Sequence, residues 1–522
     1  MKQLQFFGWA WTIIVTTIAV AGCTEQPVKE RATNPLIFAD VPDMSMVRVG
    51  DTYYMSSTTM HETPGVPVMR STDLTNWEIV SYCYNRLAEI PEMNLTDGKN
   101  TYGRGTWASC IRYHNNRFYV STFAQTTGKT YIFSTDDIEK GEWQRQEFAP
   151  SYHDHTLFFD DDGHAYLIWG GGRLRIVQLK DDLSGVVPES ERVLIENAGA
   201  PAGDKLMLPA EGSQLFKVNG KYYLFNITWP RGGMRTVVIH RADRLEGPWE
   251  GRVALQDRGI AQGGLIDTPD GRWFTYLFRD YGSVGRIPYL APVTWEEGWP
   301  VLGVDGLVPD TLDLPASRGL IPGIVASDDF GRTTGEPDLP LVWQWNHQPN
   351  DSLWSVNERE GYLRLHTSRI DTLFTQARNT LTQRTIGPTC EGETAIDISG
   401  INEGDYAGLA LVQRKFGLVG VRMLQGTKQI VMVSAQTGIP EVVETLPLAG
   451  DTLYLKATCD FTERRDVADF FYSTDGKQWT KIGSQLKMEY SMPHFMGYRY
   501  GLFYYSTLQP GGHADFDYFN IQ

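Results

Sequence analysis

The sequence predicts an all-β protein of two domains, a five-bladed β-propeller followed by a β-sandwich. Two short motifs that recur five times in the same phase predict the propeller, and later short apolar runs predict the sandwich. The composition agrees, because 12% aromatic residues and 52 glycines suit strands joined by tight turns. At 522 residues the chain is too long for one hydrophobic core, so two domains are expected.

The first motif is a turn followed by aromatic residues and set between apolar runs, which is typical of a β-hairpin. It occurs at residues 50–54, 116–119, 162–166, 219–223 and 270–274. The second motif marks the turn between a third and a fourth strand, at residues 71–77, 134–143, 180–183, 241–249 and 292–299. One repeat then holds four strands in roughly 45 to 65 residues, the period of a propeller blade. Accidental repeats in a β-sandwich are the alternative, and the agreement of two independent motifs disfavours it.

The residues that open the five inner strands indicate chemistry. They are Asp43, Trp107, Asp154, Glu211 and Gln262, and radial packing of blades brings all five to one end of a central channel. Hydrolysis of a glycosidic bond needs one carboxylic acid to protonate the leaving oxygen and one carboxylate to activate water or attack carbon. Glu211 is the candidate acid and Asp43 the candidate base. A lone aspartate at a strand start is more often a turn residue, but three carboxylates at equivalent positions favour an active site. Repulsion between their negative charges would keep one of them protonated.

Charge and cysteine content exclude other classes. A formal net charge of −16 without a cluster of Lys and Arg argues against nucleic acid and favours a neutral or sugar-like substrate. Beyond Cys23, the cysteines are Cys83, Cys110, Cys390 and Cys459, and their spacing supports neither a zinc site nor a redox motif. Disulfides between the first two and between the last two, or four free thiols, all stay open; metal ligands are unknown.

The N-terminus predicts export. An apolar stretch from residue 6 to residue 20 is too short for a membrane span and ends at residues 20–23, whose sequence Val-Ala-Gly-Cys resembles a bacterial lipobox. We expect residues 1–23 to be a lipoprotein signal peptide with Cys23 as the lipidated residue, and residues 24–33 to be a polar tether. The protein is then a membrane-anchored lipoprotein of the periplasm or the cell surface. An ordinary signal peptide with an incidental cysteine is the alternative.

Domain boundaries follow from composition. The propeller is expected over residues 34–303, and residues 304–327, rich in Gly and Pro and without an aromatic hairpin, are expected to be a linker strap. Short strands from residue 328 to residue 522 predict the β-sandwich.

The first domain resembles glycoside hydrolase family 43, the five-bladed propeller β-xylosidases and α-L-arabinofuranosidases. The resemblance is carried by residues 34–67, 107–114 and 210–223, which include Pro42-Asp43, Trp107-Ala108 and Ala210-Glu211-Gly212. It implies an inverting enzyme in which Asp43 is the general base and Glu211 the general acid, while Asp154 orients the acid and tunes its pKa. No cofactor is implied for the chemistry.

Four further residues are candidate substrate contacts. The resemblance implies that Arg286 contacts the sugar near the acid, against a structural ion pair as the alternative. Many members of the family have a histidine where this chain has Gln262, a departure that makes a central metal less secure. Trp107 is expected to be an aromatic wall of the sugar site, and His61, in a loop after the first hairpin, is expected at the rim.

The second domain resembles the concanavalin-like sandwich (a jelly-roll) of β-xylosidases in this family, through residues 328–330 and 515–519. This resemblance implies that a sandwich loop closes one side of the pocket, and it allows a structural calcium ion. The implied activity is exo-acting removal of terminal β-D-xylose or α-L-arabinofuranose from plant hemicellulose oligosaccharides, that is, xylan degradation. Two alternatives remain: a non-catalytic glycan-binding surface lipoprotein, or another propeller-clan glycosidase such as a fructan-cleaving enzyme.

Overall fold

The computed structural model describes Met1 and residues 31–333, 335–492 and 494–522. Residues Arg31–Gln522 form one compact unit. The predicted signal peptide with Cys23, and the predicted tether up to residue 30, lie outside the described residues. Among the described residues, no helix has the length and hydrophobicity needed to cross a membrane.

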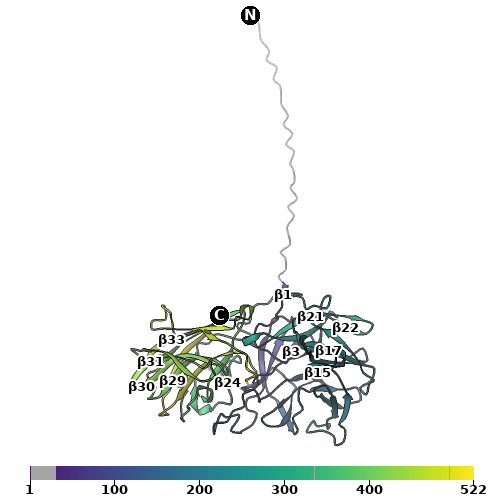
Figure 1. The fold of residues 1–522 in the computed structure, drawn as a ribbon, viewed down its shortest axis with the longest axis horizontal. Helices are drawn as coiled ribbons and strands as arrows, with labels where there is room; N and C mark the ends of the chain where they lie inside the picture. The colour runs from purple at the N-terminus through teal and green to yellow at the C-terminus, as the bar shows by residue number, and fades with distance from the viewer. Residues whose placement is uncertain (2–30, 334, 493) are drawn as a thin grey trace. The chain divides into compact units, whose positions relative to one another are not determined.

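Five four-stranded antiparallel sheets form the propeller (Figure 1). In chain order the blades are β2 (Ser45–Val49), β3 (Thr52–Ser56), β5 (Gly65–Ser71) and β6 (Glu78–Tyr84); β7 (Cys110–His114), β8 (Arg117–Ala124), β9 (Lys129–Thr135) and β10 (Gln144–Phe148); β11 (Thr156–Phe159), β12 (Ala165–Trp169), β13 (Leu174–Gln178) and β14 (Arg192–Ile195); β15 (Leu206–Val218), β16 (Lys221–Pro230), β17 (Thr236–Ala242) and β18 (Glu250–Leu255); and β19 (Ala261–Asp267), β20 (Trp273–Asp280), β21 (Arg286–Glu296) and β22 (Trp299–Leu302). Each inner strand contacts the inner strand of the next blade, and β19 contacts β2, so the five blades close into a ring.

The inner hairpins turn where the sequence motif predicts. The turn between β15 and β16 has Asn219 at φ 50° and Gly220 at φ 77°, and the turn between β7 and β8 has Asn115 at φ 49° and Asn116 at φ 60°. Two consecutive residues with positive φ match the twist of the flanking strands, which explains the Asn and Gly residues there. Both motifs thus mark strand connections within one blade.

The second domain is a sandwich of two eight-stranded sheets, the yellow and green strands of Figure 1. One sheet contains, in spatial order, β32 (Glu441–Pro447), β31 (Thr427–Ser434), β30 (Gly417–Leu424), β29 (Asp405–Val412), β37 (Arg499–Ser506), β27 (Leu381–Arg384), β24 (Gln344–Asn346) and β4 (Glu62–Thr63). The other contains β25 (Trp354–Ser355), β26 (Leu363–His366), β38 (His513–Ile521), β28 (Thr389–Asp397), β33 (Thr452–Asp460), β34 (Val467–Ser473) and β35 (Thr480–Lys481), with β36 (Leu486–Lys487) paired to β34. The predicted fold class is confirmed.

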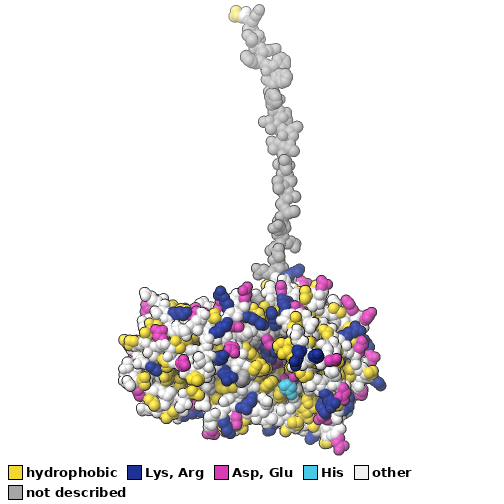
Figure 2. Space-filling model, viewed as in Figure 1, with side chains coloured by type: hydrophobic (Ala, Val, Ile, Leu, Met, Phe, Trp, Pro, Cys, Tyr) yellow, Lys and Arg dark blue, Asp and Glu magenta, His cyan; other side chains and the backbone are white. Residues whose placement is uncertain are grey.

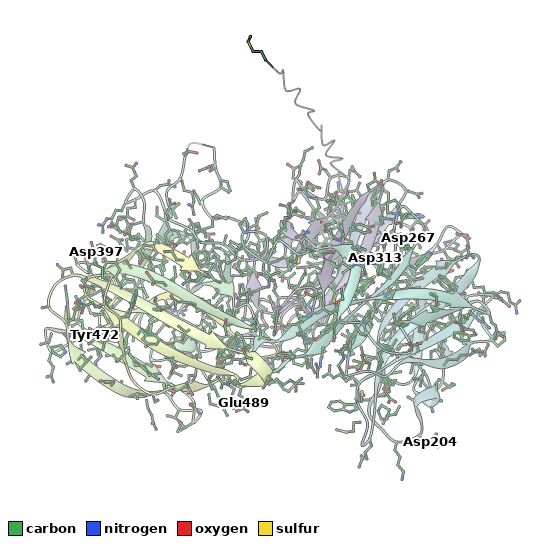
Figure 3. All side chains as sticks on the ribbon, turned by 90° about the horizontal axis from the view of Figure 1, so that it is seen from above. Asp204, Asp267, Asp313, Asp397, Tyr472 and Glu489 are labelled. Carbon is green, nitrogen blue, oxygen red and sulfur yellow. The ribbon has the colours of Figure 1, made fainter. Side chains whose placement is uncertain are left out.

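Helical structure in the described residues is limited to single 3₁₀ turns. These are η1 (Ala200–Ala202), η2 (Gly282–Val284), η3 (Asp351–Leu353), η4 (Phe374–Gln376) and η5 (Thr462–Arg464). Figure 3 places Asp397 and Tyr472 on sandwich strands and Asp267 at the end of a propeller strand.

Two segments expected to be irregular contain strands. β1 (Arg31–Thr33) lies in the predicted tether, β23 (Thr311–Pro315) lies in the predicted linker strap, and the two pair antiparallel. Part of the predicted linker strap is therefore a strand that pairs with the segment just before the propeller. The short motifs of the sequence carry no signal for this pairing, because its partners are far apart along the chain.

The sandwich takes a strand from the propeller. β4 follows the first inner hairpin of the propeller, yet it pairs with β24 as the last strand of a sandwich sheet, with Trp345 opposite Thr63 and Asn346 opposite Glu62. Gln344 of the same strand donates from Nε2 to the carbonyl oxygen of Pro64 at 2.7 Å. The first blade and the sandwich are thus joined by main-chain hydrogen bonds.

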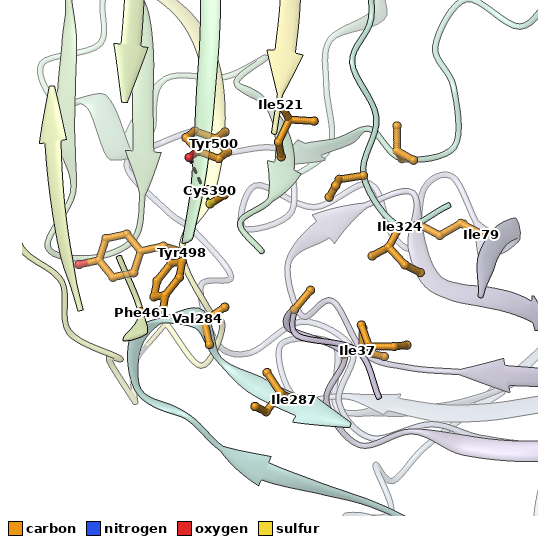
Figure 4. Close-up of a cluster of buried hydrophobic side chains, with 14 of the residues drawn as sticks. Ile37, Ile79, Val284, Ile287, Ile324, Cys390, Phe461, Tyr498, Tyr500 and Ile521 are labelled. Carbon is orange, nitrogen blue, oxygen red and sulfur yellow. Dashed lines mark hydrogen bonds between the residues drawn. The ribbon is translucent and has the colours of Figure 1, made fainter. Parts of the chain in front are cut away.

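One hydrophobic core is shared by both domains (Figure 4). Propeller residues Ile37, Ile79, Val284 and Ile287 belong to the same buried cluster as the sandwich residues Phe461, Tyr498, Tyr500 and Ile521. Cys390 and Cys459 also belong to it; they face each other across β28 and β33 and, like Cys83 and Cys110, are free thiols. The Sγ of Cys390 lies 3.3 Å from the hydroxyl of Tyr500.

Charges of both signs are scattered over the face seen in Figure 2, among hydrophobic side chains. On this face there is no broad surface of one sign.

Candidate active site

The five residues predicted to open the inner strands lie at one end of the ring. Asp43 and Asp154 come two residues before β2 and β11, Trp107 comes three before β7, and Glu211 and Gln262 lie within β15 and β19. Asp43, Asp154 and Gln262 line one small cavity of about 10 Å³ in the channel. This cavity holds at most about one water molecule, so a larger ligand would have to bind outside it.

An unusual backbone conformation recurs at these strand starts. Asp43, Asp154 and Gln262 have φ of 51°, 46° and 52°, and Gly212, next to Glu211, has φ 64°. Non-glycine residues are uncommon in this left-handed region, and such strain persists only where the surrounding fold imposes it, often at functional sites. Three of the five blades therefore have a non-glycine residue with positive φ at or near the start of the inner strand, and a fourth has a glycine with positive φ inside its inner strand.

Asp43 forms a buried ion pair with Arg286. Nη1 of Arg286 donates to both carboxylate oxygens at 2.7 Å, and Nε2 of Gln262 donates to Oδ1 at 3.0 Å. Asp43 and Arg286 are only 7% and 5% exposed. Burial raises the pKa of the Asp43 carboxyl, and the charge of Arg286 opposes this rise only in part. The carboxylate is thus held in a fixed orientation by two donors.

Arg286 keeps further donors for a ligand. Within the part of the chain that the structure describes, its Nε and Nη2 atoms are buried and have no hydrogen-bond partner. The guanidinium lies over the ring of Phe495 at 4.7 Å and over that of Phe278 at 5.3 Å. The predicted substrate contact and the alternative ion pair are therefore compatible in this arginine, because one nitrogen serves Asp43 and the other two have no partner among the described residues.

Asp154 and Glu211 lie together with His153. Nε2 of His153 is 3.7 Å from Oδ2 of Asp154 and 3.6 Å from Oε2 of Glu211. Burial raises the pKa of Asp154 to about 7, reinforced by the charges of Asp43 and Glu211 and opposed by His153. Burial lowers the pKa of His153, but Glu211, Asp154 and Asp43 outweigh it and raise the value to about 9. Near neutral pH the histidine is therefore a cation beside the two carboxyl groups.

Aromatic rings from both domains flank these groups. Trp107 stacks on Phe495 of the sandwich with ring centroids 5.0 Å apart and planes at 26°. Phe123 lies 5.8 Å from Trp107 and 5.3 Å from His153. Such rings suit the C–H faces of a sugar. Trp107 thus lies in an aromatic cluster that contains Phe495 of the sandwich.

His61 is buried among other rings. Its ring is 1% exposed and packs against Tyr102, His347 and His494 at centroid distances of 4.6, 4.9 and 4.8 Å. The loop that carries it is held by the pairing of β4 with β24. His61 thus offers no surface to a sugar, which argues against the predicted substrate contact.

Two acidic residues at the sandwich edges, Asp328 and Asp515, already have protein partners. Asp328 accepts from Nη1 of Arg332 at 2.9 Å and from Nε1 of Trp343 at 2.8 Å, and Asp515 accepts from Arg359 and Arg364. These carboxylates do not fit a calcium ion, which would need their oxygens free. Among the described residues, His153, Asp154 and Glu211 are the one group whose ligand atoms are close enough for a metal.

Sequence reasoning missed three residues at the site. His153 is adjacent to the predicted Asp154, and that adjacency is a signal that could have found it. Asp40 accepts hydrogen bonds from the backbone N–H groups of Arg286 and Gly497, at 2.7 and 3.0 Å. Phe495 comes from the other domain, and the propeller repeats contain no signal for it.

A closed five-bladed propeller with three carboxylates at one mouth of its channel has the architecture and the acid–base groups of a glycoside hydrolase. The family model for glycosyl hydrolases family 43 matches residues 32–300, and that for the beta xylosidase C-terminal concanavalin A-like domain matches residues 327–522. The chain belongs to glycosyl hydrolases family 43, and the predicted enzyme class, a glycosidase, is confirmed.

Individual relatives agree. The chain is 27% identical to a beta-xylosidase of Formosa agariphila, over 97% of this chain and 96% of that one, and 26% identical to a non-reducing end alpha-L-arabinofuranosidase of Bacteroides ovatus, over 80% and 82%. A solved structure of a bifunctional GH43-CE protein of Bacteroides eggerthii is 66% identical with a TM-score of 0.94 and covers 95% of this chain. This chain spans 64% of that protein.

Proposed function

We propose that this glycoside hydrolase removes single terminal pentoses, β-D-xylose or α-L-arabinofuranose, from hemicellulose oligosaccharides with inversion at the anomeric carbon. The observation that carries the proposal is the grouping of Asp43, Asp154 and Glu211 around one channel mouth, with Asp43 paired to a buried arginine. The names of the two curated relatives support both pentoses. The glycan-binding alternative is not favoured, because all three carboxylates are present in a chain of this family.

Each side chain then has one task. Asp43, held by Arg286 and Gln262, accepts a proton from the water that attacks the anomeric carbon. Glu211 donates a proton to the leaving oxygen, and Asp154 orients the acid and tunes its proton affinity. The free donors of Arg286 bind sugar hydroxyls, and the Trp107–Phe495 stack confines the ring to a pocket. A pocket closed by two domains favours terminal over internal cleavage. No step requires a cofactor, and a structural calcium ion has no assigned ligands.

The test is release of 4-nitrophenol from the β-D-xylopyranoside and the α-L-arabinofuranoside, with Glu211→Ala measured in parallel. We expect release from at least one glycoside and a loss of roughly 1,000-fold or more in kcat for the variant, since an activated leaving group only partly relieves the need for an acid. Proton NMR of the first-formed sugar reports whether the anomer is inverted. Undiminished turnover in Glu211→Ala would remove the assigned acid, and activity on neither substrate would redirect the search to other glycosides.

We also propose that the protein is exported and anchored in a membrane through a lipid on Cys23, facing the periplasm or the cell surface. The motif at residues 20–23 supports this. Expression of the full chain should give a protein that labels with radioactive palmitate and sediments with membranes, whereas Cys23→Ala should not label. Labelling of the variant, or a soluble unlabelled wild type, would contradict the anchor.

A further inference from the structure

His153 occupies a position between two catalytic candidates from different blades. It precedes Asp154 at the start of the third blade, and Glu211 belongs to β15 of the fourth blade. One imidazole nitrogen lies 3.6–3.7 Å from an oxygen of each carboxyl group. A single side chain therefore links the residue proposed to donate the proton with the residue proposed to tune it.

The ring of His153 is oriented by packing. Trp107 and Phe123 of the second blade meet it in edge-to-face contacts, with centroid distances of 5.8 and 5.3 Å and interplanar angles of 61° and 68°. The side chain is still 44% exposed at the mouth of the channel. The contacts with Trp107 and Phe123 restrict the orientation of the ring, and the exposed part of the side chain remains accessible to a substrate.

The charges around the ring explain its state. The groups that act on His153 are the carboxyl groups of Asp43, Asp154 and Glu211 and the imidazole of His155, whose pKa burial lowers to about 4 so that it is neutral. The nearby cation Arg286 pairs with Asp43. His153 is thus the positive charge on the Asp154–Glu211 side of the site.

We propose that His153 is a positioning residue whose imidazolium bridges Asp154 and Glu211 and stabilises the negative charge that this pair gains when a proton leaves for the glycosidic oxygen. The histidine keeps its own proton throughout. The inference rests on the proposed function, because it assigns a task within the same reaction.

The sign of the effect follows from the charge. A nearby cation lets a carboxyl pair lose its shared proton at lower pH, so removing the cation keeps that proton bound to higher pH. The alkaline limb of the kcat/KM profile should therefore move upward when His153 is neutralised. Because the ring is partly exposed and screened, a shift of about 0.5 to 1 pH unit is expected.

The experiment compares kcat/KM from pH 4 to pH 10 for wild type, His153→Asn, His153→Lys and His164→Asn. The Asn variant should lower kcat more than it changes KM and move the alkaline limb upward, and the Lys variant should return the limb toward wild type. His164, an exposed histidine in the turn between β11 and β12, is the matched control and should change neither limb. If the alkaline limb of His153→Asn is unmoved or lies at lower pH than in wild type, His153 only packs against its neighbours and the inference is overturned.

A second readout does not depend on turnover. In NMR titration of the whole protein, the imidazole signal that is lost in His153→Lys should titrate near pH 9 in wild type and at lower pH in Glu211→Gln. Titration below pH 7 in wild type would overturn the inference even if the glycosides are cleaved. If neither glycoside is cleaved but the signal titrates near pH 9 and moves in Glu211→Gln, the bridge stands and the proposed substrate fails.

Discussion

At the scale of single residues, the groups proposed to transfer protons have different environments. Asp43 is held by a permanent guanidinium and an amide, whereas Asp154 and Glu211 share a histidine. The acid limb of a pH profile then reports the loss of a proton from Asp43, and the alkaline limb reports the coupled pair. Changes at Arg286 and at His153 should accordingly move different limbs.

Arg286→Met tests the first half of this division. Without its cation the Asp43 carboxyl stays buried, so its pKa should rise further and the base should become active only at higher pH. We expect the acid limb to move upward and kcat/KM to fall by about 100-fold or more, since contacts to the sugar are lost as well. Both are measured from the pH profile of 4-nitrophenyl glycoside hydrolysis.

Arg286→Lys and Arg272→Met provide the controls. The lysine keeps the positive charge but carries all of its N–H donors on one nitrogen. The acid limb of the Arg286→Lys profile should therefore lie closer to that of wild type. Arg272 pairs with Asp270 on the surface and its loss should leave both limbs in place. A profile for Arg286→Met that is lowered at every pH without movement of the acid limb would show that the arginine binds substrate but does not control Asp43.

At the scale of elements, the blades could be predicted because their signals are local. The Asn219–Gly220 turn and its aromatic partners lie within a few residues of one another, so each hairpin can be recognised without knowledge of the rest of the fold. The phase of the repeat then predicted equivalent positions for Asp43, Asp154 and Glu211; in the structure the two aspartates come just before their strands, and Glu211 lies inside β15. Five blades complete a ring, so the contact between β19 of the last blade and β2 of the first is expected once the blades have been counted.

Elements formed by distant segments could not be predicted in this way. β4 has two residues, too few for any periodicity, and it exists because β24 of the sandwich lies beside it. The burial of His61 has the same origin, because the loop expected at a rim leads into β4 and its histidine packs against His347 and His494 of the sandwich. Phe495 was missed for the same reason: its role depends on how the second domain meets Trp107, which no motif within either domain encodes.

At the scale of the whole molecule, the two domains are joined by hydrogen bonds beside the proposed active site. Asp40 accepts one hydrogen bond from the backbone of Arg286 and another from Gly497, two residues beyond Phe495. The backbone N–H of Tyr498 donates to the carbonyl oxygen of Ser283 at 2.9 Å. A movement of the sandwich would therefore shift both the arginine that holds Asp43 and an aromatic wall of the pocket.

This continuity predicts one unfolding transition for the described unit, although proteins of two domains commonly show two. The shared hydrophobic core and the strand taken from the propeller mean that neither domain can unfold without exposing apolar surface of the other. In scanning calorimetry at several scan rates we expect a single peak.

Gly497→Ala, whose added methyl group would lie 2.1 Å from the carbonyl oxygen of Val284, should lower the temperature of the whole peak. Gly185→Ala, whose added methyl group would meet only the end of the Lys180 side chain at an ordinary contact distance of 3.8 Å, should leave the peak in place. Two resolved peaks, with only one displaced by Gly497→Ala, would show instead that the domains are energetically independent and that the interface serves the active site alone.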